Sequence, residues 1–278
     1  MSRPVDRPAI TSTPIGRRRL LRNGGVVLSL GAIAAACGED RAGPQEPGRV
    51  GNAPAPEPLP DGEVNDVVLL RTAQSLEFTA IEVYDVAVGL DVLDAATLDV
   101  VARFVDDHTG HADRLGELIT GAGGEEFRCP NPWYMERAVG PILEAVEGSD
   151  DLVRDVLQIA HVFEAVAAAT YQELVRNLTE PDLRYESMLI GADENRHAAT
   201  LAMALTGTPE GYVNPVLLGE EPAADPTDVP LQYAIPSQFG QLGTRELVVG
   251  PRDEGGGRFS IIVQTPAENS FVYDFMSC

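Results

Sequence analysis

Apolar residues recur at steps of three and four in four segments of the middle of the chain, which is the spacing of one face of an α-helix. We therefore predict helices over about residues 66–88, 95–119, 150–178 and 181–207. Asp94 suits the cap of the second helix, Ser149 with the two aspartates after it marks the third, and Thr179 and Pro181 suit the start of the fourth. Because such stripes are buried by packing against one another, the pattern predicts an all-α core.

The lengths of the connections predict how these helices are arranged. Short loops join the first helix to the second and the third to the fourth, so each pair is expected to form an antiparallel hairpin. A long connection over residues 121–150, with a short helix predicted over 133–146, joins the two hairpins. The sequence thus predicts a four-helix bundle with one long crossover over residues 63–208.

Residues 209–278 lose the helical periodicity and are rich in proline in their first part. Two runs of β-forming residues, 245–249 and 258–263, flank a loop at 251–257 and predict a β-hairpin. A third apolar run, from Phe271 to Cys278, is expected to be strand-like. We expect this C-terminal extension to pack on the bundle as a structural element, because it has no histidine and no cluster of catalytic type.

Each predicted helix carries ligand-type side chains at or beside its apolar stripe. They are Glu77 on the first helix, His108 and His111 on the second, Glu164 on the third, and Glu194 and His197 on the fourth. Residues three apart lie on one helical face, so both pairs can point into the same core. Because an isolated buried charge is costly, the carboxylates must be paired, protonated or metal-bound. Asp107 and His161 lie next to this set and are candidates for its outer hydrogen-bond partners.

A structural interpretation of the same residues stays open. A histidine on an apolar face is more often a core residue than a ligand, and Arg71, Arg103 and Arg196 are near enough in sequence to pair with buried carboxylates. The chain has only 4 histidines, however, and three of them stand at the positions of the two ligand pairs. This concentration favours a metal site.

The order of these residues resembles the ferritin-like superfamily, in which the first and third helices each give a carboxylate and the second and fourth each give Glu-x-x-His. The resemblance spans about residues 66–207 and implies that Glu77, His111, Glu164, Glu194 and His197 are metal ligands. His108 stands where the family has a Glu that bridges two metals. A neutral imidazole cannot bridge two metal ions, which leaves Glu194 as the bridging residue. Three alternatives stay open: a site with two ions, a site with one ion, and a structural remnant that binds no metal. Mixed oxygen and nitrogen ligands suit iron, which is the expected cofactor, with manganese or zinc as alternatives.

With iron, the resemblance implies oxidation of Fe(II) or reaction with oxygen or peroxide. Tyr84 and Tyr171 are candidate outer hydrogen-bond donors, although ordinary core packing is the favoured interpretation of both. The alternative function is a non-enzymatic envelope or stress-related scaffold with a degenerate site. Iron storage in a closed shell is disfavoured because the segments outside the bundle would hinder assembly, and a homo-oligomer is left open.

Residues 1–37 have the features of an export signal and are kept out of the fold. The run Arg17 to Arg22 resembles a twin-arginine signal, and the apolar stretch at 26–36 is too short to span a bilayer. That stretch ends in a site resembling a lipoprotein processing site, with Cys37 as the lipidated residue and Ala34 where Leu is usual. We expect an extracytoplasmic, membrane-anchored lipoprotein, with ordinary signal cleavage and secretion or periplasmic release as the alternative. Residues 38–62 are expected to be a flexible tether.

The chain carries 20 basic residues, all arginine, against 43 Asp and Glu, for a formal net charge of −23. This charge argues against nucleic-acid partners and leaves the lipid as the only predicted contact with the membrane. Two of the 3 cysteines, Cys129 and Cys278, follow the signal. In an oxidising compartment we expect a disulfide between them, with two unpaired buried thiols as the alternative.

Overall fold

The computed structural model of the chain describes residues 62–207, 244–266 and 268–278. The predicted signal with Cys37, the tether up to residue 61 and the proline-rich residues 208–243 lie outside the described residues. None of the described helices combines the length and the apolar character that crossing a membrane requires.

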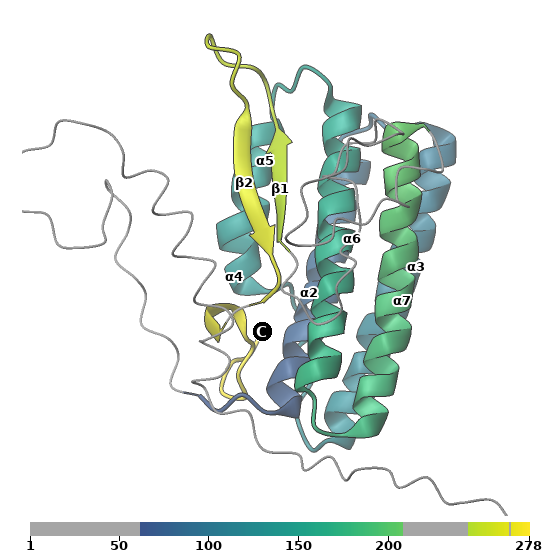
Figure 1. The fold of residues 1–278 in the computed structure, drawn as a ribbon, viewed down its shortest axis with the longest axis vertical. Helices are drawn as coiled ribbons and strands as arrows, with labels where there is room; N and C mark the ends of the chain where they lie inside the picture. The colour runs from purple at the N-terminus through teal and green to yellow at the C-terminus, as the bar shows by residue number, and fades with distance from the viewer. Residues whose placement is uncertain (1–61, 208–243, 267) are drawn as a thin grey trace, which may run out of the picture. The chain divides into compact units, whose positions relative to one another are not determined.

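Four long helices form a bundle, as Figure 1 shows. Their bounds are α2 Asp66–Gly89, α3 Ala95–Gly121, α6 Leu152–Asn177 and α7 Pro181–Thr206. Helix α2 packs along α3, α6 packs along α7, and contacts between α2 and α6 and between α3 and α7 join the two hairpins. The predicted all-α bundle with one long crossover is confirmed.

Side-chain caps fix the beginnings of three of these helices. Asn65 accepts a hydrogen bond from the backbone N–H of Val68 at α2, and Asp94 accepts one from Thr97 at α3, as predicted. At α6, Asp151 is the capping residue. Each cap satisfies one of the N–H groups that a helix leaves unpaired at its start.

The predicted cap of the fourth helix was wrong. Helix α7 begins at Pro181 after Glu180, whose side chain makes no capping bond. Thr179 instead donates from its backbone N–H and its hydroxyl to the carboxylate of Asp66, at distances of 2.9 and 2.7 Å. This bond ties the turn between α6 and α7 to the start of α2, a partner 113 positions away that local sequence cannot reveal.

The crossover between the hairpins contains the predicted short helix, interrupted in its middle. Helix α4 Pro132–Tyr134 runs into the π-helix η1 Met135–Val139 and then into α5 Gly140–Val146. Pro141 has no N–H to donate to the carbonyl of Arg137, so the ordinary α-helical bonding is broken at this point. Tyr134, Val139 and Ile142 of the crossover are buried in a hydrophobic core that they share with residues of α6.

The C-terminal extension contains the predicted β-hairpin. Strands β1 Thr244–Val249 and β2 Phe259–Gln264 are antiparallel, with Leu247 opposite Ile261. Leu247, Val249 and Val263 are buried in the same core as α5 and α6, and Figure 1 shows the hairpin beside these helices. The extension therefore packs on the bundle, as expected.

The third apolar run is not a strand, which corrects the prediction for residues 271–278. A short 3-10 helix, η4 Glu268–Ser270, precedes it, and its backbone bonds with helix α2 instead of with a strand. Thr72 accepts from the N–H of Val272, and Arg71 donates to the carbonyls of Asp274 and Met276. The predicted disulfide between Cys129 and Cys278 is present and joins the chain end to the crossover.

Candidate metal centre

All six predicted ligands meet in the middle of the bundle, one or two from each long helix. They are Glu77 on α2, His108 and His111 on α3, Glu164 on α6, and Glu194 and His197 on α7, and all six are buried. Each helix faces the bundle with the apolar stripe seen in the sequence, so the ligand-type residues within the stripes converge. Spacing along each helix places the pairs, and the packing of four helices brings them together.

These side chains form two overlapping groups of ligand atoms. Glu77, His108, His111 and Glu194 make the first group, and His108, Glu164, Glu194 and His197 make the second. Within each group the ligand atoms all lie within 4.8 Å of one another. Because Glu194 belongs to both groups and has two oxygens, the arrangement suits two adjacent cations that share this carboxylate, while His108 lies within reach of both and can bind one of them.

His108 reaches the two groups with different nitrogens. Its Nδ1 lies 2.7 Å from Oε2 of Glu77, and its Nε2 lies 3.1 Å from Oε1 of Glu164. Glu194 likewise uses different oxygens, with Oε1 2.9 Å from Nδ1 of His111 and Oε2 3.5 Å from Nδ1 of His197. Both shared residues therefore lie between the groups.

The chemistry of Glu194 fits a bound cation. Neither of its carboxylate oxygens makes a hydrogen bond within the described residues, although its side chain is fully buried. Nδ1 of His111, which lies 2.9 Å from Oε1 of Glu194, is also buried without one. Buried polar atoms in native proteins are nearly always satisfied. A metal ion would satisfy these lone pairs together.

Two aspartates outside the ligand groups, here called the outer aspartates, contact His111 and His197, the terminal histidines. Each contact is made at Nε2, the ring nitrogen on the side away from the ligand groups. Nε2 of His197 lies 3.3 Å from Asp107, and Nε2 of His111 lies 3.4 Å from Asp193. Asp107 is paired with Arg103 and Asp193 with Arg196. A carboxylate on Nε2–H selects the tautomer that leaves Nδ1 free to bind a metal.

Asp193 was missed by the sequence prediction, which included only Asp107. The sequence does contain a signal for it. Asp107 and Asp193 each stand immediately before a ligand pair, four residues before the histidine that ends this pair in the sequence, His111 or His197. The repeated spacing relates the two halves of the bundle and makes His108 the counterpart of Glu194. The other outer candidate, His161, is buried on α6 but belongs to neither group of ligand atoms.

Both tyrosines are hydrogen-bond donors to the site, which corrects the interpretation that they only pack in the core. The hydroxyl of Tyr84 on α2 donates to Oε1 of Glu164, and that of Tyr171 on α6 donates to Oε1 of Glu77. Each tyrosine follows the glutamate of its own helix by seven residues and bonds with the glutamate of the other helix. These bonds orient both carboxylates.

The arginines proposed as salt-bridge partners pair with other groups. Arg71 bonds with the chain end, and Arg103 and Arg196 pair with the two outer aspartates. The partners of the buried glutamates in the described residues are the imidazoles and tyrosines of the site itself. The salt-bridge interpretation is therefore wrong for these arginines.

The imidazoles hold protons strongly in the metal-free site. Burial alone lowers an imidazole pKa, but the hydrogen bonds and charges of the neighbouring glutamates outweigh it. The pKa of His111 rises to about 10 and that of His197 to about 9, and the pKa of His108 rises well above its usual value. A metal ion must displace these protons to bind.

The pKa values of the three buried glutamates shift in different directions. Burial raises the pKa of Glu77, but hydrogen bonds with the imidazoles outweigh it and bring the pKa down to about 2. The pKa of Glu164 also falls well below its usual value, through the charge and hydrogen bond of His108. The pKa of Glu194 rises, because burial and repulsion by Glu77 and Glu164 outweigh the attraction of His108. Glu194 is thus the carboxylate whose charge most needs a cation.

A family model described as a ferritin-like domain matches residues 65–207, which include all four long helices and all six ligand-type residues. No curated protein matches the chain. The match covers more than half of the chain and agrees with the bundle, its crossover and the buried glutamate and histidine groups. The chain therefore belongs to the ferritin-like domain family.

Proposed function

We propose that this protein binds two divalent metal ions in the bundle and oxidises Fe(II) with oxygen or peroxide. Iron is the metal that we expect at both positions. The observation that carries the proposal is the pair of buried ligand groups that share His108 and Glu194. The carboxylate oxygens of Glu194 are buried and make no hydrogen bond with the residues that the structure describes, which supports cations bound next to them. Three carboxylates and three imidazoles suit iron, manganese or zinc.

The chain's own residues would have separate tasks. Glu77 and His111 would hold one ion and Glu164 and His197 the other. Glu194, which belongs to both groups, would serve both ions, and His108 would bind one of them through one ring nitrogen. The hydroxyls of Tyr84 and Tyr171 would orient Glu164 and Glu77 by donating a hydrogen bond to one oxygen of each. The outer aspartates, through the N–H at Nε2, would hold the two terminal histidines in the tautomer that binds through Nδ1.

Iron, when bound, would supply the electrons of the reaction. With dioxygen as the oxidant, two electrons from two Fe(II) ions and two protons would convert one dioxygen into one hydrogen peroxide. With peroxide as the oxidant, two electrons and two protons give two water molecules. The protein residues supply ligands, charge balance and shielding from solvent.

Anaerobic titration of the metal-free protein with Fe(II), followed by exposure to oxygen, tests the proposal. We expect about two Fe(II) ions bound and oxidised per chain, with about one peroxide formed per two iron ions. Protein first loaded with Zn(II), which has no redox chemistry, is the control and should oxidise little iron. A chain that binds neither metal would contradict the proposal and favour the alternative, a scaffold with a degenerate site.

We further propose that the protein is exported and anchored by a lipid on Cys37, on the basis of the twin-arginine-type run and the small-residue site before this cysteine. Replacing Cys37 by alanine is expected to move the protein from the membrane fraction to the soluble fraction, because the acyl chains would be lost. Ser29→Ala in the same signal is the control. A Cys37→Ala protein that stays with the membrane would rule out this anchor.

A further inference from the structure

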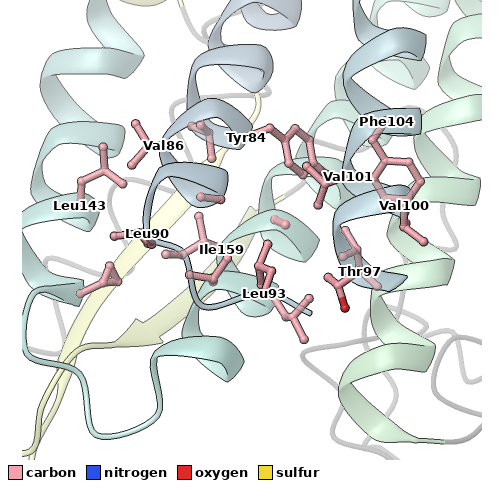
Figure 2. A pocket seen from close by; sticks show the side chains of 17 residues that line it. Tyr84, Val86, Leu90, Leu93, Thr97, Val100, Val101, Phe104, Leu143 and Ile159 are labelled. Carbon is pink, nitrogen blue, oxygen red and sulfur yellow. The ribbon is translucent and has the colours of Figure 1, made fainter. Parts of the chain in front are cut away.

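An apolar cavity lies at the end of the bundle where the α2–α3 loop and the start of α6 meet. Figure 2 shows Tyr84 and Phe104 at one end of it, with Leu90 and Leu93 toward the other. Its walls expose only apolar atoms. Leu90 and Val100 on its wall are each 37% exposed to solvent, so the cavity reaches the surface. Its volume is about 40 Å³, roughly room for three water-sized molecules.

A second cavity of about 40 Å³ lies next to the first one. The two share three wall residues, Val83, Tyr84 and Ala160. The inner cavity is lined mainly by apolar side chains and reaches His108 and Glu164 of the candidate metal centre. Two neighbouring apolar cavities, which share part of their walls, thus extend from the surface to two ligand-type residues.

We propose that these two cavities are the path by which dioxygen reaches the metal centre. The inference rests on the proposed function, in which oxygen is an oxidant. Dioxygen is small and apolar, so it loses little on leaving water for an apolar cavity, whereas ions and peroxide lose their hydration there. An apolar cavity of this kind stays dry and accepts small apolar molecules such as xenon.

The aromatic residues between the cavities and the centre support this occupant over a larger one. Tyr84 donates its hydroxyl to Glu164, and Phe104 stacks on His197 with ring centroids 4.0 Å apart. Tyr84 and Phe104 also contact each other edge to face. With their rings held by the site, a diatomic molecule can pass beside them more readily than an alkyl chain. The volumes of the two cavities agree with this size.

Xenon binding to the metal-free protein tests the path without any reaction. Anomalous scattering from crystals under xenon pressure is expected to show xenon in one or both cavities. The Ala160→Phe variant should lose the xenon site next to this residue, because the ring fills the shared space. A wild-type protein that binds no xenon in either cavity, or that binds a fatty acid there in place of xenon, would overturn the proposal.

The rates of iron oxidation give a second, independent test. Ala160→Phe is expected to slow oxidation of bound Fe(II) by oxygen about tenfold, while oxidation by hydrogen peroxide keeps the wild-type rate. Because a larger side chain can strain the core by about 1–3 kcal/mol, Val83→Leu provides a milder obstruction with the same expected direction. Val88→Phe, on an exposed position of α2 outside both cavities, is the control.

If Ala160→Phe and Val83→Leu bind normal amounts of iron and oxidise it with oxygen at the wild-type rate, the proposed oxygen path is wrong. Failure of the proposed function has a different signature, since the wild-type chain would then oxidise iron with neither oxidant. The xenon result would still stand in that case, because it needs no metal.

Discussion

Replacing Glu194 by glutamine is expected to abolish binding of at least one metal ion and to weaken metal affinity by at least about 100-fold. Glu194 belongs to both ligand groups, so its loss affects both ions. Glutamine keeps the shape of the side chain but removes a negative charge that burial and two neighbouring glutamates disfavour. The metal-free variant should therefore stay folded, with a free energy of unfolding within about 1 kcal/mol of wild type.

Elemental analysis and thermal unfolding with and without Fe(II) or Zn(II) measure this effect. Wild-type protein at 100 times its dissociation constant should gain about 2.7 kcal/mol of stability from the metal, and Glu194→Gln should gain little. Glu82→Gln is the matched control, because Glu82 is exposed on α2 outside the apolar stripe. If Glu194→Gln retains wild-type metal content, the shared-ligand interpretation is wrong and the case for two ions fails with it.

Replacing Arg258 by alanine is expected to lower the free energy of unfolding by about 3 kcal/mol, the largest stability effect outside the metal centre. Nη2 of Arg258 donates to both oxygens of Asp155, a fully buried carboxylate in the first turn of α6. Ser149 and the N–H of Gly250 complete its hydrogen bonds. Without the guanidinium, the carboxylate stays buried and loses its opposite charge. The hairpin then loses its ion pair with the bundle, although the hydrogen bond from Gly250 remains.

Urea denaturation compares this variant with Arg252→Ala, an exposed arginine of the same hairpin loop that should change stability by less than about 0.5 kcal/mol. The double variant Asp155→Ala with Arg258→Ala should cost less than the sum of the two single changes, because no charge is left unpaired. Equal effects of Arg258→Ala and Arg252→Ala would show that the ion pair adds nothing.

The two halves of the bundle repeat one ligand pattern with a single difference. In each half a glutamate is followed seven residues later by a tyrosine, and an aspartate is followed four residues later by a histidine. The residue after the aspartate is Glu194 in one half and His108 in the other. The site therefore has one negative charge fewer than a fully repeated pattern would give, and a ring with two nitrogens lies where a carboxylate would provide two oxygens.

The sequence by itself determined the helices, their pairing and the identity of the buried ligand-type residues. These features depend on local periodicity, on spacing within one helix and on loop length. All three can be determined from residues that are close together in the sequence. The long crossover and the β-hairpin could be predicted for the same reason. The pairing of Cys129 with Cys278 needed only two candidate cysteines and the expectation of an oxidising compartment.

Only the tertiary structure decided which atoms meet. The bonds of Tyr84 with Glu164, Asp193 with His111 and Thr179 with Asp66 join residues 80 or more positions apart, and their geometry depends on how whole helices pack. The backbone of the last run found its partners on α2 instead of on a strand, which no alternation of apolar residues could reveal. Periodicity fixes the face on which a side chain lies, whereas the packing of the helices fixes what that face contacts.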